Sequence, residues 1–261
     1  MSSHDSSYGT DLRELSSTEA GHRKLMTYSV RALGKWETNS TCDTARGTDG
    51  IQFPPDIKKE DRLDVFFGVY FCRSIGFSFD HDEDLLGVRV KHFSQNSFYD
   101  SKSDDDRCYC TPTMDCDQDG VFHAGPCMQG APIFFSKPHF LEAPFYQANI
   151  TGLKPDPGEH DGWLKIEPWL GQTALAGIKL QPNIALEPDH SMKIPFAPNL
   201  LPLLWIDGTN GFGQEQVDML NSLLFNKIRI LRTMASVLLV AGFVLVTAFL
   251  YYNHRRKGQL V

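Results

Sequence analysis

The feature that most restricts the fold is a stretch of nineteen uncharged residues at positions 234–252, MASVLLVAGFVLVTAFLYY. As an α-helix it would be roughly 29 Å long, about the thickness of the hydrocarbon core of a bilayer. Soluble helices of this length almost always carry a polar stripe, which this stretch lacks. Tyr251 and Tyr252 lie where aromatic residues border a membrane, and a basic cluster follows them. We therefore predict a transmembrane helix at residues 233–253 and a cytoplasmic tail at residues 254–261.

The cysteines indicate which side of the membrane the rest of the chain occupies, because basic residues flank both ends of the span. They are clustered and even in number: Cys42, Cys72, Cys108, Cys110, Cys116 and Cys127. Such a set is typical of disulfides in an oxidising compartment or of a metal site in a reducing one. The sequons at Asn39 and Asn149 favour the secretory pathway, where N-glycosylation takes place. We therefore expect residues 29–232 to form a disulfide-bonded ectodomain.

Residues 1–28 are polar and rich in serine, and they lack the apolar core of a signal peptide. We expect a flexible lead here. A chain whose only hydrophobic span is near its C-terminus would insert tail first and leave its cysteines in the reducing cytosol. Because this conflicts with a disulfide-bonded ectodomain, we interpret the sequence as a truncated isoform or an incomplete gene product. The alternative is a tail-anchored cytosolic protein whose cysteines bind zinc.

Between residues 28 and 210, short apolar runs alternate with proline and glycine, a pattern typical of a β-rich domain. Val88 and Val90 alternate with Arg89 and Lys91, as expected of a half-buried antiparallel strand. The predicted strands are residues 63–71, 87–93, 133–135, 162–167, 192–196 and 203–206. The predicted fold class is therefore α+β and mainly β.

The periodicity changes at residues 214–231, where apolar residues recur at helical intervals and lead into the span. These residues are Val217, Leu220, Leu224, Ile228 and Leu231. We predict a helix that packs its domain onto the membrane-proximal region, with a membrane-surface helix as the alternative. Gly208, Gly211 and Gly213 are interpreted as the turn before it.

Several classes of function lack support in the sequence. With a formal net charge of −7, the chain lacks the excess of basic residues by which proteins bind nucleic acid. The motifs of the common hydrolases, metalloproteases and phosphate-binding enzymes are missing, so we predict neither catalytic residues nor a cofactor. The acidic runs at residues 80–84 and 104–106 are interpreted as solvated turns.

Two candidate metal motifs are incomplete. Asp115, Asp117, Asp119 and Gly120 resemble the start of a calcium-binding loop, but the twelfth position is Pro126 instead of a glutamate. The cysteines near His123 do not form the paired knuckles of a zinc site. We therefore expect an acidic turn inside a disulfide loop and no metal site.

Short motifs along the chain point to a known family. From about Tyr28 to Tyr252 the chain resembles the class B scavenger receptors. The resemblance rests on seven ordered segments around the cysteines and on the C-terminal span: Trp36-Glu37 before Cys42, Gly47-Thr48-Asp49-Gly50 before Phe53-Pro54-Pro55, Cys72-Arg73-Ser74-Ile75, Cys108-Tyr109-Cys110, Pro138-His139-Phe140-Leu141, Ile166-Glu167-Pro168 and Leu203-Leu204-Trp205.

The resemblance implies an ectodomain built on an antiparallel β-barrel with peripheral helices and a lipid-conducting cavity, held between two membrane spans. It implies the disulfides Cys42–Cys108, Cys72–Cys127 and Cys110–Cys116, whereas the sequence alone leaves fifteen connectivities open. The first span and the ligand-capturing apex of the family have no counterpart in this sequence, so we expect a partial barrel.

The implied function is a receptor for lipids, fatty acids or lipoprotein particles in the cell membrane or an endolysosomal membrane. Acyl chains would move through an apolar tunnel, driven by ~0.8 kcal/mol for each methylene kept out of water. Phe66, Phe67 and Phe71 are the candidates for lining this tunnel, and ordinary core packing is the alternative. A sensory-neuron member that presents hydrophobic ligands and a lysosomal member that sorts cargo are further alternatives within the family.

Overall fold

The computed structural model describes residues 33–36, 41–68, 71–185, 200–211 and 226–258, together with positions 213, 215, 218, 219 and 222. The chain divides into two compact units, Met1–Gly211 and Phe212–Val261. The predicted lead, Asn39, the strand at 192–196 and most of the stripe at 214–231 lie outside the described residues. The domain boundaries predicted at residues 28 and 232 stay predictions.

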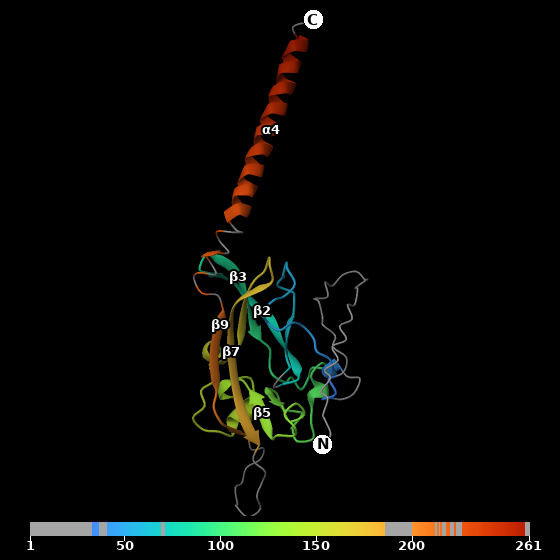
Figure 1. Cartoon of the computed structure of the whole chain (residues 1–261), viewed down its shortest axis with the longest axis vertical. Coiled ribbons are helices and arrows are strands. Elements are labelled where there is room, and N and C mark those ends of the chain that lie inside the picture. Colours follow the sequence, from blue (N-terminus) through green and yellow to red (C-terminus); the bar gives the residue numbers. More distant parts are fainter. Residues whose placement is uncertain are drawn as a thin grey trace, which may run out of the picture. The chain divides into compact units, whose positions relative to one another are not determined.

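The first unit is built on an antiparallel sheet (Figure 1). Its strands are β1 (Leu63–Phe67), β2 (Arg73–Leu85), β3 (Val88–Gln95), β4 (Val121–His123), β5 (Ile133–Ser136), β6 (Trp163–Glu167), β7 (Gln172–Ala185), β8 (Leu200–Pro202) and β9 (Ile206–Gly211). The strand order is β1-β2-β3-β6-β7-β5-β4, and β8 and β9 also pair with β7. Among the described strands the sheet is open and does not close into a barrel. The prediction of a mainly β fold with antiparallel pairing is confirmed.

The alternation predicted for Val88–Lys91 is confirmed in β3. Val88 and Val90 are buried on one face of β3, and Arg89 on the other face is exposed. Leu164 and Ile166 are buried in the same way on β6. A period of two in hydrophobicity therefore identified the two strands at the centre of the sheet.

The two longest strands were not predicted, because each breaks the usual pattern. The second half of β2 holds the acidic run at residues 80–84, so the prediction of a solvated turn there is wrong. β7 contains Gly177 and Pro182, which normally interrupt strands. Gly177 is needed because a Cβ atom there would lie 2.4 Å from the Trp163 ring.

The predictions for residues 203–213 were also wrong in detail. Residues 203–205 join two short strands, β8 and β9, that pair with different parts of β7. Gly208 and Gly211 belong to β9 and do not form a turn before a helix. Gly211 fits there because a Cβ atom would lie 2.4 Å from the Ala174 carbonyl oxygen.

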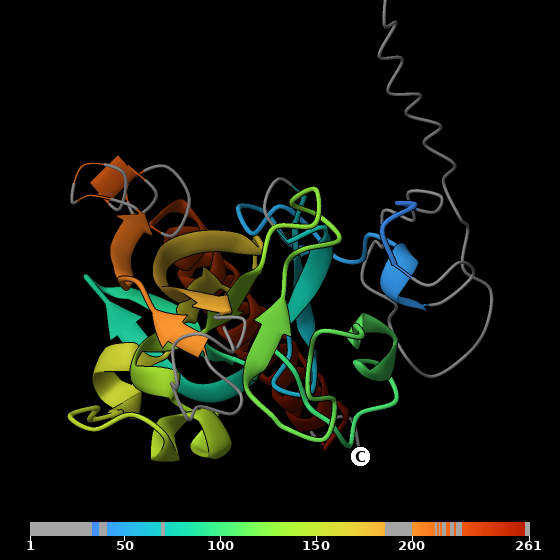
Figure 2. The ribbon, with the colours of Figure 1, turned by 90° about the horizontal axis from the view of Figure 1, so that it is seen from below.

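Short helical segments lie at the border of the sheet (Figure 2). They are η1 (Thr41–Asp43), η2 (Arg107–Tyr109), η3 (Pro138–Phe140), α1 (Pro144–Ala148) and α2 (Pro157–His160). The core beneath them is rich in aromatic residues, of which Phe53, Phe93, Tyr99, Tyr109 and Phe122 are almost completely buried.

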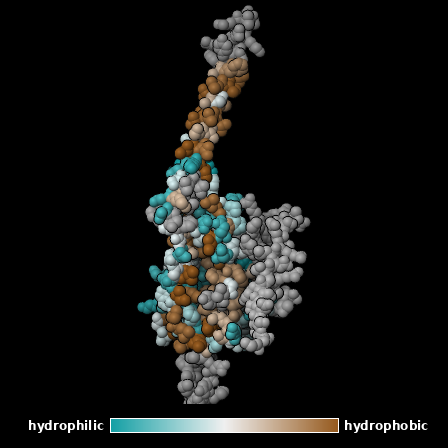
Figure 3. Space-filling view, viewed as in Figure 1, coloured by the Kyte–Doolittle hydropathy of each residue, from teal (hydrophilic) through white to brown (hydrophobic). Residues whose placement is uncertain are grey.

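The second unit contains α4 (Asn226–Gly258), a continuous helix of 33 residues. Its segment Asn226–Leu250 is long and apolar enough to cross a membrane, and none of it is buried inside the chain. Its first turns carry Lys227, Arg229 and Arg232, and the surface beyond them is mainly hydrophobic (Figure 3). Thr247 donates its hydroxyl to the Phe243 carbonyl at 3.0 Å, so this polar group has a partner within the helix. All residues of the predicted span are therefore helical. The helix itself begins earlier, at Asn226.

Candidate functional site

Three disulfides join the loops of the β domain to one another. They are Cys42–Cys108, Cys72–Cys127 and Cys110–Cys116, with Cα–Cα distances of 5.8, 5.6 and 5.7 Å. These distances are ordinary for disulfides, and no cysteine remains free. The pairing is the one that the family resemblance implies. Because all six sulfurs are bonded to each other, the structure leaves no thiolate for the alternative of a zinc site.

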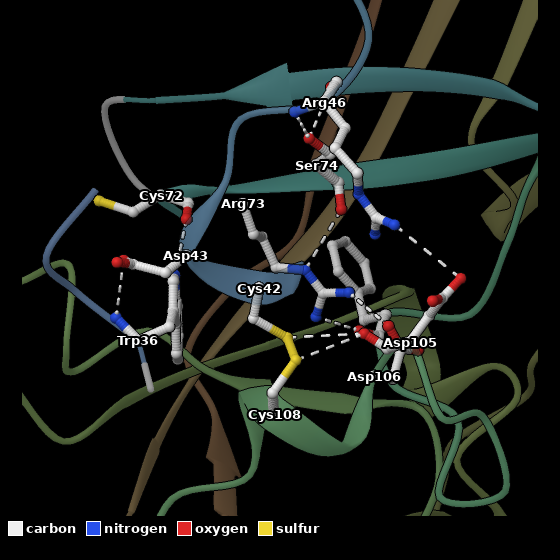
Figure 4. The surroundings of a disulfide bond; sticks show 11 residues. Trp36, Cys42, Asp43, Arg46, Cys72, Arg73, Ser74, Asp105, Asp106 and Cys108 are labelled. Atoms are coloured by element: carbon white, nitrogen blue, oxygen red, sulfur yellow. Dashed lines mark hydrogen bonds and ion pairs between the residues drawn. A yellow bond between two sulfur atoms is a disulfide. The ribbon is translucent and has the colours of Figure 1, made fainter. Parts of the chain in front are cut away.

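Arg73, which follows Cys72, is the most deeply buried cation of this disulfide-bonded part (Figure 4). Its guanidinium lies 3.8 Å from the centre of the Tyr109 ring and donates hydrogen bonds to the Phe98 carbonyl at 2.6 Å and to Asp106 Oδ1 at 3.0 Å. Burial lowers the pKa of Arg73, and the nearby Tyr109 and Asp106 oppose that change. An arginine remains charged in such a setting, so the guanidinium holds the Phe98 carbonyl and Asp106 together by charged hydrogen bonds.

Trp36 connects the N-terminal loop to the same place (Figure 4). Its indole N–H donates to the Cys72 carbonyl at 2.7 Å, and its ring meets the edge of Tyr109 with centroids 5.0 Å apart. Ser74 Oγ accepts from the Arg46 N–H at 2.9 Å and donates to the Arg46 carbonyl at 2.6 Å. Residues of three family motifs thus contact one another in this part of the core: Trp36, the Cys72–Ser74 segment and Tyr109.

The three tunnel candidates lie in two different environments. Phe71 is only 5% exposed and contacts the rings of four other phenylalanines: Phe67, Phe98, Phe122 and Phe135. Phe67 is half-buried and lies on the core face of β1, where it pairs with Arg73. Phe66 is also half-buried, but it lies on the opposite face, where it pairs with Ser74. The structure therefore brings Phe67 and Phe71 together and separates Phe66 from them.

Asn149 follows the short helix α1 and is exposed, as is Thr151 of the same sequon. Its side-chain amide donates to the Phe145 carbonyl at 3.1 Å. This position leaves Asn149 accessible to a glycosylating enzyme. Asn39 lies outside the described residues, so the structure offers no view of the second sequon.

The acidic motifs have partners in the protein. Asp119 Oδ1 accepts from the Ser101 N–H at 2.7 Å, and Asp115 Oδ1 accepts from the Asp117 N–H at 3.2 Å. The carboxylates of the calcium-like motif are therefore used in turns, as expected. His123 Nδ1 lies 2.8 Å from the hydroxyl oxygen of Thr111, which gives this buried histidine a structural role.

A buried lysine with two carboxylate partners lies beside η3 and was not predicted from the sequence. Lys137 is 1% exposed, and its ammonium lies 2.7 Å from both Glu142 and Asp161. It also donates to the Gln95 carbonyl at 2.8 Å. Burial raises the pKa of Asp161, and the adjacent Lys137 acts in the opposite direction. The available signal was the position of Lys137 directly before the Pro138-His139-Phe140-Leu141 motif.

In its second half, β7 buries polar side chains on one face and carries aliphatic side chains on the other, the reverse of an ordinary surface strand. Lys179, Gln181 and Asn183 are buried on one face, whereas Ile178 on the other face is 50% exposed. Strand register extends this second face across β8 and β9, since Leu180 pairs with Ile206 and Ile184 pairs with Leu201. We call this surface the open apolar face, and it consists of Ile178, Leu180, Ile184, Leu201 and Ile206. Ile178, Leu201 and Ile206 are exposed, whereas Leu180 and Ile184 are half-buried.

Such an arrangement is unusual, because the solvent-facing side of an antiparallel sheet is normally polar. The space-filling view shows hydrophobic side chains among hydrophilic ones on the surface of the β domain (Figure 3). Contiguous apolar surface of this kind marks a place where a protein binds something apolar. The open apolar face is therefore the strongest binding candidate among the described residues.

Comparison with known proteins identifies the chain's relatives. Residues 16–253 match the CD36 family. The chain is 31% identical to sensory neuron membrane protein 1 of Manduca sexta over 207 residues, which covers 78% of this chain and 39% of that protein. It is 29% identical to sensory neuron membrane protein 1 of Bombyx mori over 87% of this chain and 44% of that protein. It is 25% identical to lysosome membrane protein 2 of Rattus norvegicus, covering 90% and 50%.

The chain thus spans half or less of the length of these relatives. The apolar helix and the kind of relative agree on a cell or lysosomal membrane as its location. The match covers the sheet, the three disulfides and the span together, and it is a match to a family of scavenger-type membrane receptors. The chain belongs to the CD36 family.

Proposed function

We propose that this chain is a membrane-anchored receptor component that binds lipids, fatty acids or lipoprotein particles and transfers apolar molecules to the bilayer. The observation that carries the proposal is the open apolar face, because β7 buries Lys179, Gln181 and Asn183 on one face and carries aliphatic side chains on the other, where Ile178 is exposed. Burial of apolar surface contributes about 25 cal/mol per Å². An acyl chain lying on this face is stabilised without any covalent chemistry, so the proposed function needs no catalytic residue.

The proposal places the β domain outside the cytosol, because disulfides persist in oxidising compartments. Three disulfides and the exposed sequon at Asn149 support this orientation. The test is an endoglycosidase shift on the chain expressed in animal cells, with Asn149→Gln and Asn39→Gln as variants. We expect the shift to fall with each substitution. A chain that carries no glycan and six free thiols would instead support a cytosolic domain.

The lipid step is tested on the open apolar face. Ile206→Glu introduces a charge there. Ile51→Glu is the matched control, since Ile51 is an exposed isoleucine in a loop and not on this face. Cells that display equal amounts of each variant are given a fluorescent long-chain fatty acid. We expect uptake to fall at least several-fold for Ile206→Glu and to stay unchanged for Ile51→Glu. Equal uptake by both variants would remove this face from the lipid path.

Phe66 is the tunnel candidate with the least role in the aromatic core, so it provides the second test. Phe66→Glu should reduce fatty acid uptake without a change in surface amount, and Phe66→Leu should keep most of it. Retention of Phe66→Glu in the endoplasmic reticulum would show that Phe66 is a packing residue.

A second candidate function is favoured by the relatives named sensory neuron membrane protein 1. In this case the receptor would present hydrophobic ligands to a partner in a sensory neuron. Localisation of the tagged chain distinguishes the two, because a lysosomal or general surface distribution would contradict a neuronal role.

A further inference from the structure

A β-bulge in the hairpin of β2 and β3 brings two histidines onto one face. Phe79 pairs with Phe93, but the next pair is His81 with His92, so Asp80 is an extra residue on β2. Without this bulge His81 would point to the opposite face of the sheet from His92. Glu83, two residues beyond His81, lies on the same face. The bulge therefore assembles His81, Glu83 and His92 from two strands.

The ligating atoms of these three side chains lie close together. Glu83 Oε2 is 3.8 Å from His81 Nε2 and 3.6 Å from His92 Nδ1. The two imidazole rings are stacked with centroids 4.6 Å apart, and all three ligating atoms lie within 4.8 Å of one another. Ligands of a tetrahedral zinc ion are about 3.3 Å apart, given bonds of about 2.0–2.1 Å. The two distances to Glu83 Oε2 exceed this spacing by about 0.3 and 0.5 Å, so the side chains would have to close around a bound ion.

The surrounding residues orient these groups for a metal. Asp80 Oδ2 lies 3.2 Å from His81 Nδ1, which leaves Nε2 of that ring directed to Glu83. A carboxylate behind a histidine in this way is the usual outer contact of a zinc ligand. Lys165 on β6 bonds to Glu83 Oε1 at 2.8 Å and leaves Oε2 for the histidines.

The environment of His92 is a second feature of the cluster. Its Nδ1 is buried, and its nearest charged neighbour, Glu83 Oε2, lies at 3.6 Å, just beyond ordinary hydrogen-bond distance. Buried polar atoms are rarely left in that state, because an unmade hydrogen bond costs free energy.

We propose that His81, Glu83 and His92 bind one Zn²⁺ ion and leave a fourth position open to water. Two imidazoles and one carboxylate are a typical donor set for zinc, whereas calcium and magnesium prefer oxygen ligands. His81 is about half exposed, so an ion can reach the site from solvent. The ion links β2 to β3 beyond the bulge and stabilises the hairpin. This inference is independent of the lipid-binding proposal.

The test uses the full chain, purified in detergent without a polyhistidine tag and treated with a chelator. Isothermal titration with zinc chloride should give one saturable site per chain. His92→Ala and Glu83→Gln should each weaken zinc binding by roughly 100-fold, and Asp80→Asn by roughly 10-fold, since it removes only an outer contact. Asp82→Asn is the matched control, because Asp82 lies between the ligands in sequence but on the other face of β2, bound to Lys91.

Two outcomes overturn the proposal: no saturable binding by the unaltered chain, or binding that is unchanged in Glu83→Gln. Circular dichroism and electrophoretic mobility without reductant show whether a variant is folded with its disulfides intact. Glu83→Gln keeps the size and shape of the side chain, so it remains informative if His92→Ala fails to fold. A thermal melt supplies the second readout: zinc should raise the melting temperature of the unaltered chain and of Asp82→Asn, and leave that of Glu83→Gln unchanged.

Discussion

Two parts of the β domain hold their loops against the sheet by different means. The first, from residue 33 to residue 127, contains all six cysteines and is cross-linked by three disulfides. We call it the cysteine-braced region. The second, from residue 133 to residue 211, has no cysteine and is held by buried polar contacts around Lys137 and Asn183. We call it the cysteine-free region.

This difference determines how each region responds to a reductant and to the loss of a buried charge. A disulfide acts mainly on the unfolded chain, whose freedom it restricts, so its effect is lost when a reductant cleaves it. A buried ion pair acts in the folded state, where each charge needs its partner to offset the loss of hydration. We therefore expect reductant to act on the cysteine-braced region alone. Loss of a buried charge should destabilise either region, through Lys137 in the cysteine-free region and through Arg73 in the cysteine-braced region.

The largest effect should come from opening the long cross-link between Cys42 and Cys108, which are 66 residues apart. Cys42→Ser with Cys108→Ser should lower the free energy of unfolding by about 4 kcal/mol, as chain entropy predicts for a loop of this length. The measurement is guanidinium unfolding of the full chain in detergent. A loss below about 1 kcal/mol would show that the aromatic contacts of Trp36 and Arg73 hold the region without the disulfide.

The next effect tests the cysteine-free region. Lys137→Met should lower the free energy of unfolding by about 3 kcal/mol, because Asp161 and the Gln95 carbonyl lose a buried partner. Lys59→Met is the control: Lys59 is exposed and pairs with Asp82 at 3.3 Å, so its loss should cost less than about 1 kcal/mol. Equal effects of the two substitutions would contradict the assigned role of Lys137.

The short cross-link should have a smaller effect than the long one. Cys110 and Cys116 are only 6 residues apart, and chain entropy predicts a loss of about 2 kcal/mol for Cys110→Ser with Cys116→Ser. The same unfolding measurement applies. If the short and long disulfides contributed equally, the restriction of the unfolded chain would not be the main source of their effect.

The same contrast explains what could be predicted from the sequence. Strands β3 and β6 follow a period of two in hydrophobicity, because each has one buried apolar face and one more exposed face. The buried residues are Val88, Val90, Leu164 and Ile166. β7 was missed because its buried face is polar and its open face is apolar, so hydrophobicity indicates the wrong side. The family motifs supplied the disulfide pairing, which spacing alone leaves open.

The cluster of His81, Glu83 and His92 could not be predicted for a different reason. Residues 80–84 look like a solvated acidic run, and nothing in the sequence indicates a bulge at Asp80. Only the bulge places His81 on the face of His92. Strand register is set by tertiary pairing, so local patterns do not determine it.

The smallest expected effect is a pH dependence of stability in the cysteine-free region, caused by the titration of His160. The His160 and His139 rings are stacked with centroids 4.4 Å apart, and His160 Nδ1 accepts the Asp156 N–H at 2.9 Å. Burial lowers the pKa of His160 from its ordinary value of 6.5, and His139 and Lys179 act in the same direction. Asp156 and Glu159 oppose them without reversing the change.

Because the folded pKa of His160 lies below 6.5, the unfolded chain binds the proton more readily than the folded chain. The contribution of His160 to stability is therefore complete above pH 6.5 and is lost as the pH falls from there through the folded pKa. His160→Asn keeps an acceptor for the Asp156 N–H but does not titrate, so its stability should fall less between pH 7 and about pH 5. The measurement is guanidinium unfolding of both chains at several pH values. Since the cysteine-free region contains no disulfide, the difference between the two chains should persist under reductant. Its disappearance there would show that the two regions unfold as one coupled network.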